Sequence, residues 1–283
     1  MRILRNVLCT VCAMGIGLAG AVAPAETGEP LRVTFVDVGK GDCILLSRDG
    51  HHVLIDTGYA VTAGEMAAAL AGAGADRLDA LILTHYDRDH IGGTEAVLSR
   101  FSVDQIWLPG YTGDGKNYAA TLYTVERSGI PATRVTEDVS FTFAGVEVEI
   151  FATRLRYVPG SGKDEGNDND VSLVVTARYG KDTLLFAGDI EKEGISSYLA
   201  AGHGTFDVVK MPHHGQNESN TDDFVDQVGM KIAVITDSAE ESVKKKVIKL
   251  INGAGAELYT SAQNGQITVI CHGDGNYEVQ TER

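Results

Sequence analysis

The sequence predicts a single mixed α/β domain, and three observations support this prediction. Short apolar runs that are typical of buried strands alternate along the chain with Ala-rich or amphipathic stretches that are typical of helices. Turns containing Gly or Pro separate these segments. The chain has 283 residues, a length that suits one domain of this class once an N-terminal leader is set aside.

Residues 1–25 have the features of a secretory signal peptide, which leaves residues 26–283 as the expected folded domain. Arg2 and Arg5 precede an apolar stretch, and Ala23-Pro24-Ala25 places small residues at the cleavage positions. A permanent membrane anchor is the alternative, although the apolar stretch is short and Gly-rich for a membrane span. We therefore expect an exported protein, periplasmic or secreted, that is cleaved near Ala25 and keeps no stable membrane anchor.

The chain is acidic, with a formal net charge of −15 at pH 7. Cleavage removes Arg2 and Arg5, so the chain goes from 24 basic and 39 acidic residues to 22 and 39, a net charge of −17. Proteins that bind long nucleic acids usually carry a basic face. The basic cluster here, Lys244-Lys245-Lys246 with Lys249, is typical of a solvated helix face, so the composition argues against polymeric DNA as a substrate.

Two cysteines remain outside the leader, Cys43 and Cys271, and each lies in an apolar run. An exported protein can pair such residues in a disulfide. We favour the alternative of two buried strand thiols, because nothing in the sequence brings their Cα atoms within bridging distance.

The first half of the domain begins with three strands and then alternates helices with strands. Alternating or short apolar runs bounded by Gly mark the strands, and Met66 with Leu70 marks the apolar face of an Ala-rich helix. His51 and His52 follow a turn and are expected at the surface. The expected strands cover residues 31–38, 43–47, 53–55, 78–83 and 103–108, and the expected helices cover residues 62–74, 94–100 and 117–127.

The second half begins with a hairpin about Ala144-Gly145, because both of its arms alternate apolar and polar residues. A polar loop at residues 154–170 either borders an active site or is merely flexible. Asp182 lies in a turn and is expected at the surface. The expected strands cover residues 139–143, 146–151, 171–177, 183–187, 206–211, 232–236, 256–260, 267–271 and 277–280, and the expected helices cover residues 190–200, 222–228 and 241–252.

Four potential metal ligands lie within six residues, directly after the apolar run at residues 78–83. They are His85, Asp87, Asp89 and His90, and two glycines and a helical stretch follow them. Imidazole and carboxylate groups are the usual ligands of catalytic Zn²⁺ and related ions. Such a cluster at the end of a core strand is hard to explain as an ordinary polar loop, so we predict a metal site there.

Residues 84–93 (THYDRDHIGG) resemble the signature H-x-H-x-D-H of metallo-β-lactamase hydrolases. They are more similar to the Asp-substituted version in the soluble domain of ComEC-type DNA-uptake proteins. Four further stretches agree with that subfamily and occur in its order: residues 35–42 (FVDVGKGD), 54–58 (LIDTG), 186–190 (FAGDI) and 209–215 (VKMPHHG). The resemblance implies a four-layered αββα sandwich, the metallo-β-lactamase fold, and a hydrolase that uses metal ions.

The resemblance also implies two divalent metal ions, Zn or Mn, held by two sets of side chains. One set begins with His85 and Asp87, and the other begins with Asp89 and His90. Asp189 matches the carboxylate that bridges both ions in the family. A lactone, a lactam or a phosphodiester can be hydrolysed by such a pair, so the ligand sets alone do not identify the substrate.

The chain departs from the lactamase pattern at two positions. Asp87 replaces the second histidine of the motif, and the third histidine of the family is absent. Asp168, Asn169 and Asp170 stand in its place; we assign Asp170 as the ligand and Asn169, together with Asp56, as residues that hold the ligands in position. Oxygen-rich sites suit Mn²⁺ and Mg²⁺ as well as Zn²⁺, which argues against an antibiotic-hydrolysing lactamase.

His214 matches the last histidine ligand of the family, and His213 is then left to face the substrate; the sequence also allows the reverse. Bound divalent ions lower the pKa of water from 15.7 to about 7, which makes hydroxide available at neutral pH. Asp89 is expected to orient that water or accept its proton. His213 is expected to protonate the leaving group.

We predict an exported metal-dependent hydrolase with phosphodiesterase or nuclease-like activity on a small phosphodiester or nucleic-acid-derived substrate. A hydrolase of a small ester, such as a lactone or a phosphocholine ester, is the alternative. A choline group would need an aromatic cage, for which Trp107, Tyr111, Tyr118 and Tyr157 are available. A non-catalytic binding module is the third possibility, and retention of the ligand set argues against it. The sequence leaves the oligomeric state open.

Overall fold

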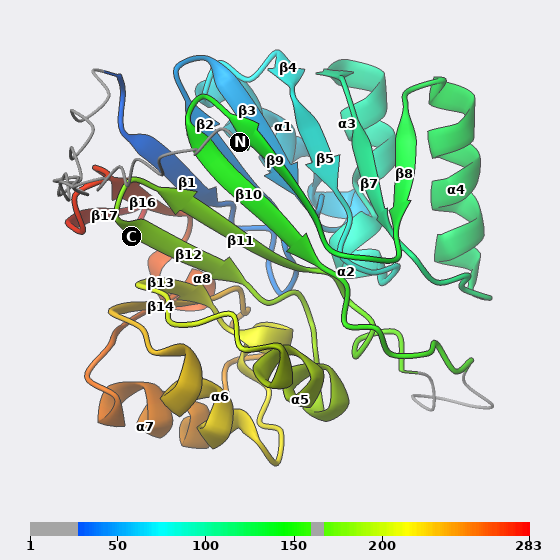
Figure 1. Cartoon of the computed structure of the whole chain (residues 1–283). Helices are drawn as coiled ribbons and strands as arrows, with labels where there is room; N and C mark the ends of the chain where they lie inside the picture. The colour runs from blue at the N-terminus through cyan, green and yellow to red at the C-terminus, as the bar shows by residue number, and fades with distance from the viewer. Residues whose placement is uncertain (1–27, 160–166) are drawn as a thin grey trace, which may run out of the picture.

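The computed structural model describes residues 28–159 and 167–283, in which two β-sheets pack face to face (Figure 1). The predicted signal peptide lies outside the described residues. One sheet has the order β17 (Tyr277–Thr281), β16 (Ile267–Cys271), β1 (Leu31–Phe35), β2 (Ile44–Arg48), β3 (His51–Ile55), β5 (Ala80–Ile82), β7 (Ile106–Pro109), β8 (Ala132–Val135). The other has the order β15 (Glu257–Thr260), β14 (Ile232–Ile235), β13 (Val208–Lys210), β12 (Asp182–Phe186), β11 (Val174–Tyr179), β10 (Val146–Phe151), β9 (Val139–Phe143).

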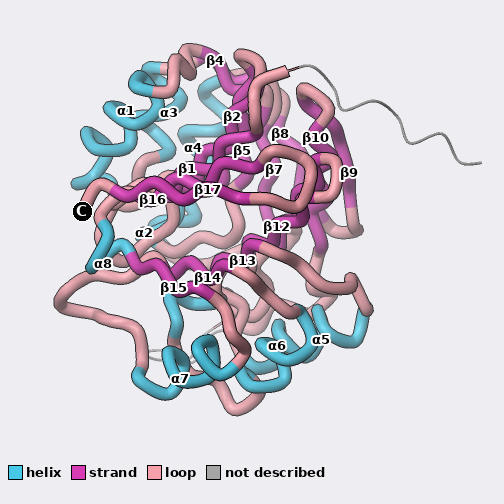
Figure 2. The backbone as a smooth tube through the Cα atoms, turned by 90° about the vertical axis from the view of Figure 1, so that its left-hand side faces the viewer, coloured by secondary structure: helices cyan, strands magenta, loops and turns pink. Residues whose placement is uncertain are grey.

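Helices cover the outer face of each sheet, and Figure 2 shows the strands running between the two groups of helices. The first sheet is covered by α1 (Ala63–Gly72), α3 (Thr94–Arg100) and α4 (Lys116–Ser128). The second is covered by α5 (Lys192–Ala201), α6 (Thr221–Val228) and α7 (Lys245–Gly253). Shorter elements are η1 (Ala60–Thr62), α2 (Arg88–Ile91), η2 (Pro212–Gly215), α8 (Ser261–Asn264) and the strand pair β4 (Arg77–Leu78) and β6 (Ser102–Val103). This arrangement confirms the predicted four-layered αββα sandwich. Among the described residues, no helix is long and apolar enough to cross a membrane.

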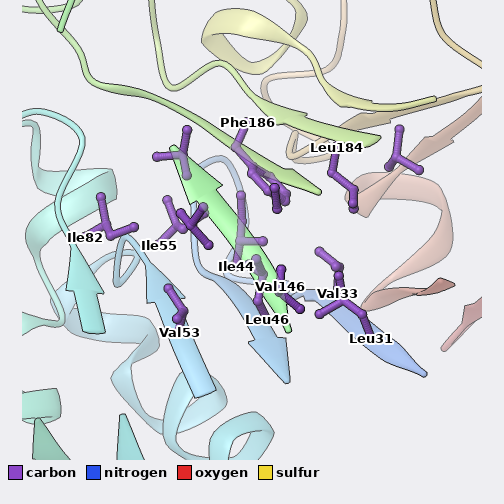
Figure 3. Close-up of a cluster of buried hydrophobic side chains, with 14 of the residues drawn as sticks. Leu31, Val33, Ile44, Leu46, Val53, Ile55, Ile82, Val146, Leu184 and Phe186 are labelled. Atoms are coloured by element: carbon purple, nitrogen blue, oxygen red, sulfur yellow. The ribbon is translucent and has the colours of Figure 1, made fainter. Parts of the chain in front are cut away.

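Apolar side chains fill the space between the two sheets and the space beneath each layer of helices. Figure 3 shows Val33, Ile44 and Leu46 of the first sheet directed toward Val146 and Phe186 of the second. All five are at most 1% exposed. Burial of such a side chain stabilises the fold by roughly 1.5–3 kcal/mol. The sheets are therefore held rigidly against each other, which fixes the positions of the loops at their ends.

The polar motifs of the sequence lie at the carboxyl ends of parallel strands from both sheets. In the first sheet β3 and β5 run parallel, and in the second β12, β13 and β14 run parallel. The main chain connects the two groups, because the backbone N of Leu173 donates to the carbonyl oxygen of Thr84 at 2.9 Å. Ligand sites in α/β proteins commonly lie at such carboxyl ends.

Several boundaries differ from those expected, for local reasons. The apolar run at residues 78–83 is interrupted at Asp79, whose carboxylate accepts a hydrogen bond from the backbone N of His52 at 2.8 Å. Helix α7 begins at Lys245 and not at residue 241, because the Asp237 carboxylate accepts a hydrogen bond from the backbone N of Val243 at 3.0 Å and holds the preceding turn. The sequence does not predict β8, an edge strand whose first three residues are exposed and polar or small.

Two residues expected at the surface are buried, so that expectation is wrong for both. His52 is 4% exposed, and its Nδ1 lies 2.9 Å from the hydroxyl of Ser47. Asp182 is 0% exposed, and its carboxylate accepts hydrogen bonds of 2.7 Å from the backbone N atoms of Gly273 and Gly275. Asp182 therefore ties β12 to the turn between β16 and β17.

The two cysteines of the domain are free thiols, as we favoured from the sequence. Cys43 precedes β2 and Cys271 ends β16, and both are fully buried. Burial raises the pKa of each thiol above its ordinary value. Both side chains therefore behave as small apolar core groups.

Candidate metal centre

Two of the predicted ligands are buried, His85 in the loop after β5 and His90 in the short helix α2, and Asp56 holds this segment in place. Asp56 follows β3 and accepts hydrogen bonds from the backbone N and the hydroxyl of Thr84, at 2.8 and 2.7 Å. The other contact of its carboxylate is with Nδ1 of His90, at 2.7 Å. Asp56 thus joins the start of the metal loop to His90.

Imidazole nitrogens and carboxylate oxygens from both sheets converge on one point. Nε2 of His90 lies 3.3 Å from Nε2 of His214 and 3.3 Å from the Asp189 carboxylate. Nε2 of His214 lies 3.0 Å from Asp189 and 3.6 Å from Asp89. The ligand atoms of His85, His90 and Asp189 all lie within 4.8 Å of one another. Residues more than 120 positions apart in the sequence are thereby brought to one site.

The second nitrogen of each ring is anchored, which directs Nε2 toward the centre. Nδ1 of His85 lies 3.1 Å from the Thr84 hydroxyl, and Nδ1 of His214 lies 3.0 Å from the Thr236 hydroxyl. Nδ1 of His90 contacts Asp56, as described above. Histidine ligands of metals are commonly oriented through their second nitrogen in this way. Nε2 of His85 is buried and has no hydrogen-bond partner in the described part of the chain, so the donor set fits a divalent ion.

The charges of the buried side chains at the centre balance one another. Burial, aided by His90, lowers the pKa of His85 to about 3, which keeps this ring in the neutral form that binds metals. Burial opposes the charge of His90, but Asp189 and Asp56 raise the pKa of its ring well above the ordinary value. Burial also opposes the charge of Asp189, yet His214, His90 and Lys210 hold the pKa of this carboxyl well below its usual range.

Backbone strain is concentrated at the centre. Asp56, His213 and His214 have φ angles of 57°, 45° and 50°, in the left-handed region that side chains other than Gly rarely adopt. Each such residue costs on the order of 1–3 kcal/mol and persists only where the surrounding structure imposes it. The strain at His213 and His214 turns the chain sharply after β13, so that His214 points inward and His213 points toward the surface.

Asp87 and Asp168 form the second, more open side of the centre. A carboxylate oxygen of Asp87 lies 3.8 Å from Nε2 of His85, and the Asp87 side chain is 44% exposed. Asp87 and Asp168 contact each other through their side chains, and burial raises the pKa of both carboxyls. Asp168 thus approaches His85 and Asp87 at the place where the lactamase family has a histidine.

Asp170, which we assigned as a ligand, lies elsewhere in the structure. Its carboxylate accepts a hydrogen bond of 2.7 Å from the backbone N of Gly194, near the start of α5. The side-chain amide of Asn169 donates to Glu191 at 3.0 Å, and its Oδ1 is buried without a hydrogen-bond partner among the described residues. The three adjacent polar residues point in different directions because the chain turns there, and only tertiary contacts distinguish them.

His213 lies at the rim of the centre and contacts Glu191. Nδ1 of His213 is 3.2 Å from the Glu191 carboxylate, and the His213 side chain is 19% exposed. Burial opposes the charge of this ring, but Glu191 raises the pKa of His213 above its ordinary value. Asn169 and His213 therefore contact the same Glu191 carboxylate.

The sequence did not identify Asp42, Lys210 and Thr236, which form a buried network behind the ligands. Nζ of Lys210 lies 2.6 Å from Asp42 and 3.3 Å from Asp189, and it donates to the carbonyl oxygen of Gly188 at 2.9 Å. The Thr236 hydroxyl donates to Asp42 at 2.6 Å and lies against His214. A signal was present, because Lys210 interrupts the apolar run at residues 206–211. A lysine in a buried strand is costly unless it is paired.

Lys210 is fully buried and remains charged because of its partners. Burial lowers the pKa of a lysine, but Asp42 and Asp189 raise the pKa of Lys210 above its ordinary value. The same region requires a glycine at position 41. A Cβ on Gly41 would lie 2.6 Å from the carbonyl oxygen of Asp89. The close approach lets the backbone N of Asp42 donate to that oxygen at 3.1 Å, which joins Asp42 to the metal loop.

The sequence matches one family model and several competence proteins. The model of the family described as the metallo-beta-lactamase superfamily matches residues 36–236. ComE operon protein 3 of Bacillus subtilis is 27% identical over 258 residues, which cover 83% of this chain and 32% of that protein. Competence protein ComA of Neisseria gonorrhoeae is 28% identical over 233 residues, which cover 80% of this chain and 30% of that protein. The chain thus spans about a third of the length of these relatives.

Solved structures support the fold. The crystal structure of the metallo-beta-lactamase fold protein YhfI from Bacillus subtilis matches with a TM-score of 0.53 and 12% sequence identity, and the match covers 84% of this chain and 99% of that one. At this identity the likeness concerns the arrangement of helices and strands alone. The chemistry therefore has to be argued from the residues at the centre.

Proposed function

The chain belongs to the metallo-β-lactamase superfamily, and from this premise we propose that it is a metal-dependent hydrolase of phosphodiester bonds. The observation that supports the proposal is the convergence of His90, His214 and Asp189 with their supporting hydrogen bonds. A non-catalytic module would not need three anchored imidazole rings directed at one buried point. The similarity to competence proteins adds a reason to favour a phosphodiester over a lactam, although it concerns only part of those proteins.

We propose that two divalent ions, Zn or Mn, are held on the two sides of the centre. The His90 side contributes His90, His214 and Asp89. The Asp87 side contributes His85 and the carboxylates of Asp87 and Asp168. Asp189 lies between the two sides and is proposed to serve both. When bound, such ions acidify water and neutralise charge on the phosphodiester.

The residues of the chain itself are proposed to position the reactants and move protons. Asp89 is 14% exposed at the inner end of the site and accepts the proton of the attacking water. His213, held by Glu191 at the rim, donates a proton to the leaving oxygen. Lys210 holds Asp189 from behind, so that the carboxylate keeps its place as charge moves. General acid and base groups placed in this way typically contribute roughly 100- to 10,000-fold in rate.

The acidic composition leads us to propose a small or short substrate in preference to long DNA. The net charge of −15 repels a polyanion at low ionic strength.

The test of the proposed activity is hydrolysis by protein that has been stripped of metal and reloaded with Zn²⁺ or Mn²⁺. The substrates are bis-p-nitrophenyl phosphate, p-nitrophenyl phosphorylcholine, a lactone and DNA. We expect the phosphodiester to be hydrolysed fastest and long DNA slowly. Lactone turnover without phosphodiester turnover would contradict the proposal and favour a small-ester hydrolase.

We also propose that the protein is exported and acts in the periplasm or outside the cell. The proposal is supported by the basic start, the apolar stretch and the small residues at Ala23-Pro24-Ala25. Mass spectrometry of the mature protein from its native host is expected to find an N-terminus near Glu26. Mature protein that retains Met1 would contradict cleavage.

A further inference from the structure

A cleft of about 500 Å³ lies beside the metal loop and is not used by the reaction described above. Its walls come from the segment after β7, from the end of β8, and from described residues that follow β10 and precede β11. Figure 1 shows the chain leaving β10 at the end of the sheet where α2 lies. Aromatic, basic and apolar side chains line the cleft, among them Tyr111, Tyr157, Arg154, Arg156, Val171 and Leu173.

The cleft is attached directly to the metal centre. The hydroxyl of Tyr111 accepts a hydrogen bond of 3.1 Å from the backbone N of Tyr86, the residue between His85 and Asp87. On the opposite wall, the backbone N of Leu173 donates to the carbonyl oxygen of Thr84 at 2.9 Å. A group bound in the cleft would therefore lie next to the Asp87 side of the centre.

Two stacked tyrosine rings form one wall of the cleft. The ring centroids of Tyr111 and Tyr157 are 4.6 Å apart with an interplanar angle of 26°. Tyr157 is held from its far end, because its hydroxyl donates to the Asp114 carboxylate at 3.0 Å. Tyr86 packs edge-on against Tyr111, with centroids 5.1 Å apart. The pair is thus a fixed, flat aromatic surface, and both rings are only partly buried. They stack on each other and do not form the open cage that a choline group would need.

The charge of the cleft differs from that of the whole protein. The chain carries 39 acidic and 24 basic residues, yet among the described residues that line the cleft two are arginines and none is acidic. Arg154 is paired with Asp138 at 2.6 Å. Arg156 is exposed, and within residues 28–159 and 167–283 no carboxylate pairs with its guanidinium. An exposed guanidinium beside an aromatic wall is suited to bind a phosphate or to stack.

We propose that this cleft is a subsite for the nucleoside part of the substrate, with the base stacked on Tyr157 and held by the guanidinium of Arg156. The inference deepens the proposed function and rests on it, since it names a nucleotidyl ester as the class of phosphodiester. Aromatic side chains bind bases of any sequence through their π faces. A nucleotide unit also fits a cleft of this volume, whereas a long polyanion is disfavoured by the rest of the surface.

The test compares two esters that share the scissile bond and the leaving group. They are the p-nitrophenyl ester of thymidine 5′-monophosphate and methyl p-nitrophenyl phosphate. We expect the metal-loaded protein to prefer the thymidine ester by about tenfold or more in kcat/KM, the size of one base-stacking contact. Tyr157→Leu and Arg156→Gln should each reduce this preference and leave the rate on the methyl ester unchanged.

Matched controls are available on α4, where Tyr123 and Arg127 form an exposed pair, with the Arg127 guanidinium 5.4 Å from the Tyr123 ring. Tyr123→Leu and Arg127→Gln should keep the preference of the wild type. A second readout is calorimetric binding of thymidine 5′-monophosphate to metal-free protein. We expect binding that is weakened in Tyr157→Leu and Arg156→Gln but not in the controls.

The two readouts separate the inference from the proposed function. Binding that depends on Tyr157 and Arg156, together with no hydrolysis of either ester, supports the subsite and contradicts the phosphodiesterase. Equal hydrolysis of both esters, with no such binding, supports the phosphodiesterase and overturns the subsite. A preference that persists unchanged in both cleft variants also overturns it, because the base would then be recognised elsewhere.

Discussion

The two sides of the metal centre differ in how firmly the protein holds them. His90 and His214 are at most 1% exposed, and the second nitrogen of each ring is anchored by Asp56 or Thr236. On the other side, the Asp87 side chain is 44% exposed, and its neighbour Asp168 carries a carboxyl whose pKa is raised by burial. His85, on the same side as Asp87, is fully buried and anchored by Thr84. The comparison therefore indicates one side with two preorganised imidazoles and one side whose carboxylates are adaptable around an anchored His85.

The difference has a consequence for metal binding. A rigid site loses little conformational entropy when an ion arrives, whereas an exposed carboxylate pair must be ordered and must lose bound protons or water. We therefore expect the ion on the His90 side to bind more tightly than the ion on the Asp87 side. The variants below are expected to affect the two sides separately or together.

Asp189→Ala is expected to have the largest effect, because this carboxylate lies between the two sides. Without it the ions would lose a shared ligand and repel each other, and the attacking water would lose its position. We expect hydrolysis to be abolished and bound metal to fall, while the fold is retained. Hydrolysis rate, metal content and thermal melting measure these effects.

The control for Asp189→Ala has to be an aspartate without a structural role. Asp182 is unsuitable because it is buried and bonded to two backbone N atoms. Asp226 is exposed on α6, and Asp226→Ala should leave rate, metal and melting unchanged. If Asp189→Ala retains both its metal and its rate, Asp189 does not serve both ions.

His213→Asn is expected to have the second largest effect, and it acts on the rate alone. Asparagine tolerates the left-handed backbone of this position better than most residues. Loss of a general acid should lower kcat by roughly 100- to 10,000-fold, with metal content unchanged because His213 is not among the inner ligands. His272→Asn is the control, since His272 is a partly exposed residue paired with Glu278. A loss of metal in His213→Asn would instead indicate that His213 is the ligand.

Lys210→Met tests the network that supports the imidazole side. The substitution removes the lysine partner of the buried carboxylates Asp42 and Asp189, and breaking a buried ion pair typically costs about 3–5 kcal/mol. We expect a large fall in the melting temperature of the metal-free protein and a smaller fall when metal is bound, because the ions can neutralise Asp189. Lys231→Met is the control: its pair with Asp207 is exposed and is worth about 0–1 kcal/mol. Equal melting of the two variants without metal would show that the network contributes little.

Asp168→Asn and Asp170→Asn test the adaptable side, where we expect the smallest effect. Asp168→Asn should weaken only the ion on the Asp87 side, so that metal content falls from about two to about one ion per chain. Asp170→Asn should keep both ions, because its carboxylate is occupied by the backbone N of Gly194. Elemental analysis after reconstitution distinguishes the two. The reverse pattern would restore Asp170 as the ligand.

Much of the fold and part of the metal centre could be predicted from local patterns in the sequence. Strands such as β9, β10 and β16 begin and end where the alternation of apolar and polar residues begins and ends, because one face of each is buried. The loop from His85 to His90 was identified because its ligands lie within a few residues of one another. Such patterns are local in the sequence, so they can be recognised without knowing which distant residues the element packs against.

The misassignments share a cause. Asp168, Asn169 and Asp170 are chemically similar and adjacent, and a turn directs each one differently. Asp182 and His52 follow turns that look solvated in the sequence, but the turn after β16 and the side chain of Ser47 cover them. The sequence alone carries no information about which distant segment will be placed against a given residue.

The sequence by itself determined the alternation of strands and helices, the acidic charge and the types of ligand available to a metal. Tertiary structure alone decided that Asp42, Lys210 and Thr236 support the ligands, and that Asp168 and not Asp170 faces His85. The physical reason is that hydrophobic periodicity specifies which face of an element is buried. It does not specify which polar groups meet where the ends of two sheets come together, since those contacts depend on packing across the whole domain.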